Sequence, residues 1–247
     1  MTEWFENESF WRELYPYMFD ENRFAQAVEQ VRKIMKLTGI RRGAVLDLCC
    51  GPGRHSVALT KRGFQVTGVD RTRFLLNKAR RHAKSARAHV EFVRADIRDF
   101  VRLDTYKLAL NLWNSFGYFK NKKDDRLVLR NIFSSLQKGG VCVVDVFGKE
   151  RMAKSIQPTH TTRHPDGSLL VEVHEIFDDR SRIRKEWILI KGNRAKRFKF
   201  HQNVYSGKEL KDLLQKTGFA EVKLFGDFDG HPYGMDAPRL VAVARKV

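Results

Sequence analysis

The feature that most constrains the fold is an apolar run that ends in a glycine turn. Residues 45–48 are Val-Leu-Asp-Leu, and the turn that follows, residues 49–53, is Cys-Cys-Gly-Pro-Gly. A second apolar run, residues 66–69, ends in Asp70. A strand that enters a glycine turn and a helix, followed by a strand that ends in a carboxylate, is how a doubly wound sheet holds a nucleoside. The glycines admit the ligand, and the carboxylate binds its ribose.

The spacing within the turn separates two kinds of nucleoside ligand. A dinucleotide fingerprint, G-x-G-x-x-G/A, would require a glycine or alanine where this chain has Ser56. Counted from Cys49, the turn is C-x-G-x-G, which resembles the G-x-G-x-G loop of class I S-adenosylmethionine-dependent methyltransferases with cysteine in the first glycine position. Gly51 and Gly53 let the backbone approach the ligand closely, and Pro52 fixes one backbone angle. The turn by itself is also compatible with a plain strand-to-helix connection.

The next elements follow the order of the same family. Residues 71–84 predict a basic helix, and residues 89–93 predict a third strand. The resemblance implies that Asp96, just after this strand, accepts a hydrogen bond from the adenine amino group and that Ile97 packs on the adenine ring. Asp96 is also suited to cap the turn that starts at Ile97, and both roles are compatible.

Polar and aromatic side chains crowd the end of the fourth predicted strand. Residues 106–112 are a nearly continuous apolar run, as expected for a strand that is buried on both faces. Residues 113–119, Trp-Asn-Ser-Phe-Gly-Tyr-Phe, follow it. Ligands of open α/β sheets bind outside the carboxyl ends of the strands, so we expect Asn114 and Tyr118 to orient the substrate.

The rest of the chain completes the pattern. A helix is predicted over residues 123–136, followed by a turn at Gly139-Gly140 and a fifth strand over residues 141–146. A final helix through Gly218 precedes an antiparallel strand pair, residues 221–225 and 239–244. The predicted fold is α/β, a Rossmann-like doubly wound seven-stranded sheet with an antiparallel last strand, an N-terminal helical cap and a small antiparallel β insertion. The predicted units are residues 1–40 (cap), 41–148 (S-adenosylmethionine-binding core), 149–204 (substrate-side insertion) and 205–247 (C-terminal part of the core sheet).

Two amphipathic helices are predicted before the core. They cover residues 8–19 and 21–37, with Asp20 as a cap between them. Phe24, Val28, Val31 and Met35 recur at helical spacing in the second helix. Four aromatic side chains of the first helix either face the sulfonium of the cofactor or pack in the core, and they are Trp11, Tyr15, Tyr17 and Phe19.

The insertion alternates in polarity and contains two turn signals, residues 164–167 and 178–181. It is predicted to form an antiparallel platform beside the active site. Leu169, Val171, Val173, Glu175 and Phe177 are predicted to face one way and to be matched across the turn by Ile183, Trp187, Leu189 and Lys191. The polar and aromatic loop over residues 226–234, with Tyr233, is predicted to contact the substrate.

The formal charge of +18 and the pI near 10 admit two interpretations. A surface that tracks phosphates would make the acceptor RNA or DNA. A solvated basic surface is favoured, because the charge is spread along most of the chain. The N/D-P-P-Y motif of enzymes that methylate exocyclic base nitrogens is missing after the fourth strand, where residues 111–114 are Asn-Leu-Trp-Asn. A nucleic-acid acceptor therefore stays open but is not favoured.

Composition limits the remaining classes. A chain of 247 residues with 42% apolar residues can bury one large core. Three cysteines, two of them adjacent, make neither a disulfide framework nor a zinc set, so no metal site is expected. No window has the length of a membrane span and the first residues are acidic, which predicts a cytoplasmic protein without membrane contact.

The predicted function is methyl transfer from S-adenosylmethionine to a nucleophilic nitrogen or oxygen of a small molecule, with S-adenosylhomocysteine as product. An RNA methyltransferase and a non-catalytic nucleoside-binding protein are the alternatives. The predicted cofactor-binding residues are Tyr17, Cys49, Gly51, Gly53, Asp70, Arg71, Asp96, Ile97 and Leu112. The predicted catalytic residues are Asn114, Tyr118 and His201, and the candidates for a general base are His55, Asp145, His201 and Asp229.

Overall fold

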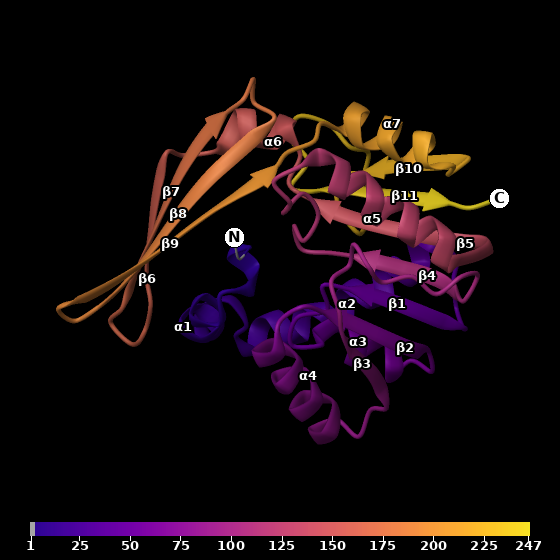
Figure 1. Ribbon diagram of the computed structural model, residues 1–247, viewed down its shortest axis with the longest axis horizontal. Helices are drawn as coiled ribbons and strands as arrows, with labels where there is room; N and C mark the ends of the chain where they lie inside the picture. Colours follow the sequence, from indigo (N-terminus) through magenta and orange to yellow (C-terminus); the bar gives the residue numbers. More distant parts are fainter. Residues whose placement is uncertain (1–2) are drawn as a thin grey trace.

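A central seven-stranded sheet organises the molecule in the computed structural model, which describes residues 3–247 (Figure 1). Its strand order is β10-β11-β5-β4-β1-β2-β3, and β11 runs antiparallel to both of its neighbours while the other pairs are parallel. The strands are β1 (Ala44–Leu48), β2 (Gln65–Asp70), β3 (Val90–Arg94), β4 (Tyr106–Asn111), β5 (Leu136–Val146), β10 (Glu221–Phe225) and β11 (Leu240–Arg245). The predicted doubly wound sheet with one antiparallel strand is confirmed.

Helices bury both faces of this sheet. The helices are α3 (Arg54–Thr60), α4 (Arg73–Ser85), α5 (Lys122–Ser135) and α7 (Gly207–Thr217). Leu46 of β1 and Ala109 of β4 share a core with α5 and α7, whereas Val45 and Leu108 share the opposite core with α3. Successive residues of a strand point to opposite faces, so each buried strand contributes to both cores.

The helix caps follow from short polar side chains at the expected positions. The Asn121 side chain accepts from the backbone N–H of Lys123 at the start of α5, and Ser206 and Glu209 form a reciprocal capping box on α7. One boundary differs from the prediction. Gly139, with φ of +76°, lies inside β5, which starts at Leu136, so Gly139-Gly140 is an irregularity within the strand and not a turn before it.

The N-terminal segment contributes a single turn of helix, η1 (Trp4–Glu6), followed by α1 (Glu8–Met18) and α2 (Glu21–Thr38). The Asp20 side chain accepts from the backbone N–H of Arg23 at 2.8 Å, which confirms the predicted cap. The predicted inner face of α2 is wrong by one position. Val28 is 51% exposed, whereas Ile34 is buried, because α2 packs against α3 through a stripe that passes through Val31 and Ile34.

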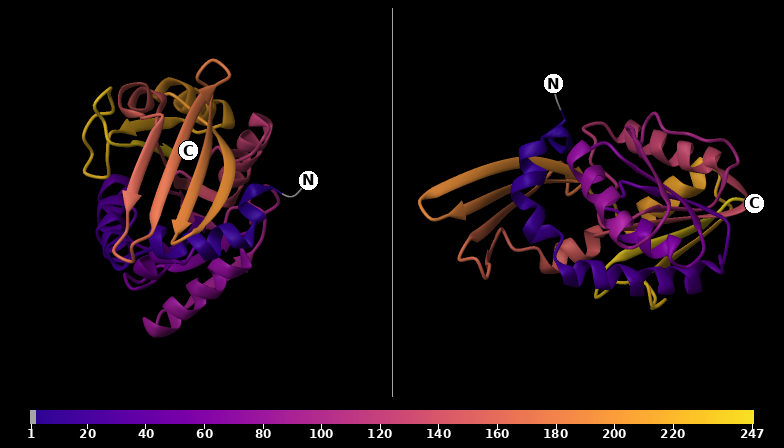
Figure 2. Two further views of the ribbon diagram at one scale, coloured as in Figure 1. Left: turned by 90° about the vertical axis from the view of Figure 1, so that its left-hand side faces the viewer. Right: turned by 90° about the horizontal axis from the view of Figure 1, so that it is seen from below.

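A second sheet of four antiparallel strands stands away from the core and leans over the N-terminal helices (Figures 1 and 2). Its elements are α6 (Lys149–Ser155), β6 (Thr159–Arg163), β7 (Leu169–Phe177), β8 (Arg182–Lys191) and β9 (Arg194–Asn203). Residues 164–167 and 178–181 form two of its turns, as predicted, and residues 192–193 form the third.

The predicted side-chain pairing between β7 and β8 is wrong. The turn at residues 178–181 has four residues, so Phe177 pairs with Arg182, and odd-numbered residues of β7 lie opposite even-numbered residues of β8. Val171 therefore pairs with Ile188 on the outer face, and Trp187 pairs with Glu172 on the inner face. A shift of one residue moves every side chain to the other face of a sheet.

The inner face of the second sheet packs on α1 through aromatic side chains. The Phe10 ring centroid lies 5.9 Å from that of Trp187 and 5.4 Å from that of Phe198. The Trp4 ring of η1 stacks on Phe200 with centroids 4.7 Å apart. The N-terminal segment thus fills the space between the two sheets (Figure 2). Over residues 3–247 no helix has both the length and the apolar character needed to cross a bilayer.

Candidate functional site

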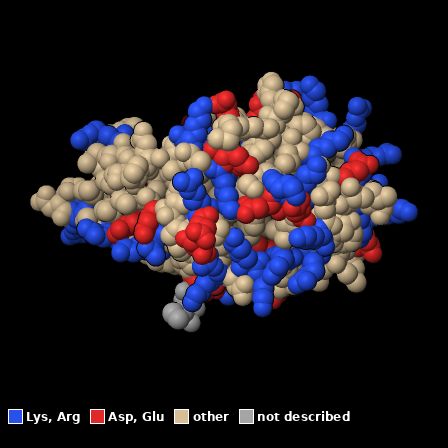
Figure 3. Space-filling model, turned by 90° about the horizontal axis from the view of Figure 1, so that it is seen from above, with Lys and Arg blue, Asp and Glu red and all other residues tan. Residues whose placement is uncertain are grey.

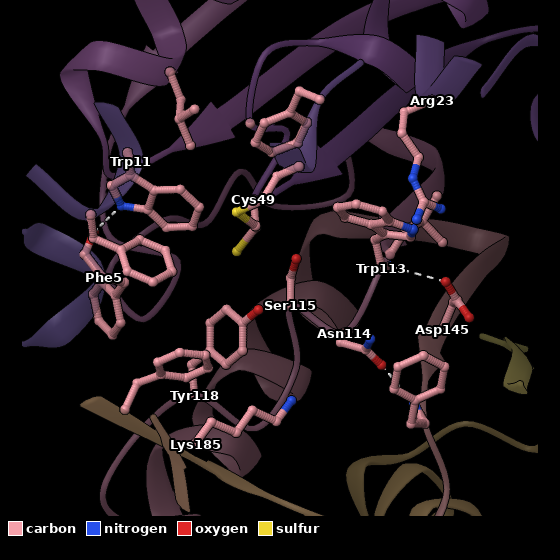
Figure 4. Close-up of a pocket in the computed structure, with 18 of the residues that line it drawn as sticks. Phe5, Trp11, Arg23, Cys49, Trp113, Asn114, Ser115, Tyr118, Asp145 and Lys185 are labelled. Carbon is pink, nitrogen blue, oxygen red and sulfur yellow. Dashed lines mark hydrogen bonds between the residues drawn. The ribbon is translucent and has the colours of Figure 1, made fainter. Parts of the chain in front are cut away.

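One cavity of about 1020 Å³ lies where the strand ends of the core meet η1, α1 and the inner face of the second sheet (Figure 4). Eight of the nine predicted cofactor-binding residues line it. They are Tyr17, Cys49, Gly51, Asp70, Arg71, Asp96, Ile97 and Leu112. Gly53 is the exception. A side chain at Gly53 would come within 3.1 Å of Ala79 and Phe92, so this glycine allows close packing behind the loop and does not face the cavity.

The glycine loop has an alternating left-handed backbone. Cys49, Gly51 and Gly53 have φ of +56°, +55° and +76°. This region favours glycine, and a cysteine adopts it at some cost in free energy. Cys49 therefore takes the conformation expected of the first glycine in G-x-G-x-G, and its Sγ lies 3.9 Å from the side-chain nitrogen of Asn111. The substitution keeps the geometry of the loop.

Asp70, at the end of β2, is built to accept hydrogen bonds. Its two carboxylate oxygens each accept one backbone N–H, from Gly51 and from Thr72, both at 2.8 Å. A carboxylate has about four acceptor positions, so two stay open towards the cavity. Burial raises the pKa of Asp70, and the two backbone N–H groups oppose that shift. This arrangement fits the two hydroxyls of a ribose.

Asp96 is held by its neighbour Arg98. The backbone N–H, Nε and Nη2 of Arg98 donate to the Asp96 carboxylate at 2.9, 3.0 and 2.7 Å. Burial favours the neutral acid, but these hydrogen bonds prevail and lower the pKa of Asp96. One acceptor position remains, next to the buried side chain of Ile97. A single amino group beside an apolar ring fits this pair.

Two arginines and a tryptophan form a cationic end of the cavity. The Arg54 and Arg23 guanidinium carbons lie 4.4 and 4.9 Å from the Trp113 ring centroid. Desolvation lowers the pKa of Arg54 to about 10, so it remains charged at neutral pH. Among residues 3–247 neither guanidinium has a carboxylate within 4 Å. These arginines are therefore available for a ligand carboxylate.

The backbone directly after β4 is strained and is held in place by hydrogen bonds. Trp113 and Asn114 have φ of +61° and +64°. The Asp145 carboxylate and carbonyl accept the backbone N–H groups of Trp113 at 2.9 Å and of Asn114 at 3.0 Å, and the carboxylate also accepts Arg239 Nε at 2.6 Å. The Asn114 Oδ1 accepts from the Phe147 N–H at 2.6 Å, which leaves its side-chain NH2 without a partner among the described residues. Asp145 positions this loop and is not placed to act as a base.

The side of the cavity opposite the glycine loop is lined by the second sheet, and we call it the acceptor chamber. Its residues include Ser115, Tyr118, Phe147, Arg151, His160, Glu172, His174, Lys185, Trp187 and Phe200. The Tyr118 hydroxyl has no hydrogen-bond partner in the described part of the chain, and burial raises its pKa, so it is a protonated donor. In Figure 4 Tyr118 and Lys185 lie on the same side of Ser115, and the polar ends of both side chains lie towards it.

Several predicted residues lie elsewhere. His201 is on the outer face of the second sheet, because β9 alternates and its neighbours Phe200 and Gln202 face inwards; the prediction that it is catalytic is therefore not supported by its position. Tyr233 donates to Glu150 at 2.6 Å outside the cavity. Asp229 pairs with Lys33 on the surface at 2.6 Å.

Two further expectations need correction. His55 lines the cavity, but burial lowers its pKa to about 3 and its Nε2 is bonded to Gln30 at 2.8 Å, which makes it a poor proton acceptor. Trp11, Phe19 and Tyr17 line the cavity, whereas Tyr15 packs on Phe74 outside it. The Tyr17 hydroxyl donates to Asp166 at 2.7 Å and thereby joins α1 to the turn before β7.

Sequence reasoning missed the Arg23–Arg54 pair, Arg239 and Lys185. Arg54 directly follows the glycine loop, which was a usable signal, because the first turn of that helix faces the loop's ligand. Lys185 could be placed only with the correct register of β8.

Comparisons with known proteins agree with this geometry. A family model described as a methyltransferase domain matches residues 45–140. Putative methyltransferase YqeM of Bacillus subtilis (strain 168) is 24% identical over 93% of this chain and 94% of its own length. The glycine/sarcosine N-methyltransferase of Aphanothece halophytica is 26% identical over 87% of this chain and 79% of its own length. A solved S-adenosylmethionine-dependent methyltransferase from Clostridium acetobutylicum ATCC 824 has a TM-score of 0.76 at 14% identity and 97% coverage of both chains, which shows a shared fold.

Proposed function

Since this chain is a class I S-adenosylmethionine-dependent methyltransferase, we propose that it methylates the amine nitrogen of a small-molecule acceptor. The observation that carries the proposal is the cavity that joins the glycine loop to the acceptor chamber. Its volume of about 1020 Å³ is at the upper end for ligand pockets, as needed for a cofactor together with a small acceptor.

The side chains present fit the cofactor at three points. Asp70 has two open acceptor positions for the ribose hydroxyls, and Asp96 has one for the adenine amino group. Arg23 and Arg54, without carboxylate partners in the described chain, fit the carboxylate of the methionine part. These assignments place the ligand's carboxylate beside positive charge and its neutral hydroxyl and amino donors beside carboxylate acceptors.

The bound cofactor supplies an activated methyl group, so no nucleophilic side chain is required. The protein's part is to hold the acceptor's lone pair in line with that group, at near-attack distance. The Tyr118 hydroxyl and the Asn114 side-chain NH2 are free donors at the strand end and would orient the acceptor. The aromatic side chains of Trp4 and Trp11 close the cavity and exclude water.

A small acceptor is favoured over RNA by the shape of the site. The cavity lies under η1, α1 and the second sheet, whereas a polynucleotide needs an open groove that follows its phosphates. Lys and Arg side chains are interspersed with Asp and Glu over the face shown in Figure 3, without one continuous basic track. The high net charge is therefore assigned to solvation.

An amine is favoured over a hydroxyl by one comparison. The glycine/sarcosine N-methyltransferase matches along most of both chains, and its printed name gives nitrogen as the methylated atom. The acceptor chamber also contains Glu172, whose carboxylate suits an ammonium group before it loses its proton.

The test is a methylation assay with S-adenosylmethionine and a panel of glycine, sarcosine, amino sugars, matched hydroxy compounds and transfer RNA, read by mass spectrometry of the products. We expect N-methylation of a small amine and at least tenfold less activity with Tyr118→Phe. Tyr15→Phe, the same change on α1 outside the cavity, is the matched control. Methylation of RNA with no turnover of any amine would refute the proposal.

A further inference from the structure

Lys185 is a cation that lines the cavity without a carboxylate partner among the described residues. It lies on the inner face of β8, and its Nζ donates to Gln202 Oε1 at 3.2 Å. Within the described residues no carboxylate oxygen lies within 4 Å of this Nζ. The Phe200 ring centroid is 5.9 Å away, and the amine projects towards Ser115 (Figure 4). An unpaired ammonium in such a site is costly, so its protonation state depends on what shares the cavity.

Gln202 determines which hydrogen bond the Lys185 amine makes to the protein. Its side-chain NH2 donates to the carbonyls of Asn114 at 2.9 Å and of Phe116 at 3.0 Å, so its oxygen must face Lys185 as an acceptor. Lys185 satisfies that acceptor with one N–H in either protonation state. A neutral Lys185 therefore keeps a lone pair that is free to point into the acceptor chamber.

The surroundings of Lys185 lower its pKa but leave it mostly protonated at neutral pH. Desolvation lowers the pKa of Lys185 to about 8; Glu172 opposes this shift, and Arg239 adds to it. Burial also lowers the pKa of His174, which pairs with Lys185 across the strands. The other charged or titratable groups of the chamber and its rim are Cys49, Tyr118, Asp145, Arg151 and His160. Of the two acids in this set, Asp145 is paired with Arg239, whereas Glu172 has no cationic partner within 4 Å among the described residues.

The cofactor brings a second cation into the same cavity. A sulfonium cannot release its charge by losing a proton at that centre, whereas a lysine can, so the like-charge conflict is relieved at Lys185. Desolvation of both charges in one cavity makes this relief larger than it would be in water.

We propose that Lys185 releases its proton to solvent when the sulfonium of S-adenosylmethionine enters the cavity, and that the neutral amine then takes a proton from the acceptor's ammonium group. The acceptor's nitrogen lone pair, freed by that transfer, forms the N–CH3 bond. The S–CH3 bond breaks with its electron pair left on sulfur. Lys185 holds the acceptor's proton during methyl transfer and ends protonated beside a neutral thioether, and the N-methylated product carries the positive charge that the sulfonium has lost. The second step rests on the proposed amine acceptor, and the first does not.

The first step is tested by calorimetric titration with S-adenosylmethionine and S-adenosylhomocysteine, which differ by the charged methyl group. At pH 7 about nine-tenths of Lys185 is protonated, so wild type should release about 0.9 proton more than Lys185→Met on binding S-adenosylmethionine. The affinity of wild type for S-adenosylmethionine should rise about tenfold more between pH 7 and pH 9 than that of the variant. The ligand's own amino group also titrates in this range, with a pKa of about 8. The difference between wild type and Lys185→Met therefore isolates the contribution of Lys185.

Controls separate the possible failures. His174→Gln removes the neighbouring titratable group and should retain the extra proton release of wild type. Equal S-adenosylhomocysteine affinity in wild type and Lys185→Met shows that the variant is folded, and Lys185→Gln serves if it is not. The same proton release in wild type and the variants would overturn the proposal.

The second step is tested with the amine that the panel above identifies. In Lys185→Met the methylation rate at saturating S-adenosylmethionine should fall at least tenfold at pH 7 and recover as pH rises, because the amine then loses its proton in water. A variant whose rate and pH profile match wild type would refute this step. The absence of any amine substrate would instead refute the proposed function and leave the binding result intact.

Discussion

The sharpest quantitative prediction concerns Asp70, whose carboxylate accepts two backbone N–H groups and keeps two open acceptor positions, which we propose bind the ribose. A hydrogen bond to a charged acceptor contributes about 1.5–3 kcal/mol. Loss of two such bonds in Asp70→Ala therefore costs about 3–6 kcal/mol, which weakens S-adenosylhomocysteine binding by a factor of about 10² to 10⁴. The loop itself loses the acceptor for Gly51 and Thr72, so this is a lower bound.

Asp70→Asn should be almost as harmful as Asp70→Ala. Each carboxylate oxygen of Asp70 faces a backbone donor, so an NH2 group in place of either oxygen would meet an N–H. Asp99→Ala, an exposed site after β3 with the same change in charge, is the matched control and should bind normally.

The assay is isothermal titration calorimetry with S-adenosylhomocysteine and with its 2′-deoxy analogue. Wild type should bind the deoxy analogue about tenfold to a hundredfold more weakly, whereas Asp70→Ala should bind both ligands nearly alike. Circular dichroism of each free protein checks that the fold is kept. Binding of S-adenosylhomocysteine by Asp70→Ala within threefold of wild type would show that the ribose lies elsewhere.

Two further predictions concern charged groups at either side of the site. Arg54→Met should weaken S-adenosylhomocysteine binding about tenfold to a hundredfold, but it should leave the binding of 5′-methylthioadenosine, which lacks the carboxylate, unchanged. The surface variant Arg32→Met is the control. Equal losses of affinity for both ligands would contradict the assignment of Arg54 to the carboxylate. Burial raises the pKa of Asp125 to about 6, so its folded state binds more protons than the unfolded chain between about pH 4 and 6. As pH rises through that interval, the free energy of unfolding from urea titrations should therefore fall by up to about 3 kcal/mol more in wild type than in Asp125→Asn, because other shifted carboxyls such as Asp47 contribute equally to both proteins.

The cofactor side of the site was predictable because its signals are local. The alternating φ angles of Cys49, Gly51 and Gly53 belong to one turn, and the strands on either side of that turn have distinct apolar runs. Asp70 and Asp96 each follow a strand directly, so their place at the sheet edge follows from the order of the elements. Of the predicted cofactor-binding residues, Gly53 alone does not line the cavity, since its packing against Ala79 depends on how close α4 lies.

The acceptor side was not predictable to the same extent. Whether a residue of β7, β8 or β9 faces the cavity depends on the exact number of residues in each turn, and an error of one residue exchanges the two faces. His201 was chosen and Lys185 was missed for this reason. The prediction that Tyr233 contacts the substrate failed for a different reason. Its hydroxyl donates to Glu150 and its ring packs against Gly207, and no local sequence pattern encodes such contacts between distant segments.

The loop over residues 113–119 joins the two sides of the cavity, one formed by the core sheet and the other by the second sheet. On the core side, Asp145 accepts its first two backbone N–H groups. On the side of the second sheet, Gln202 donates to two of its carbonyls, and Asn203 donates its backbone N–H to Gly117 at 2.6 Å. A side chain at Gly117 would come within 2.4 Å of the Asn203 carbonyl, so the loop and the end of β9 are held against each other. The strained residues Trp113 and Asn114 are therefore fixed by both sheets, and the register of β9 sets the position of Tyr118 and Lys185 relative to the glycine loop.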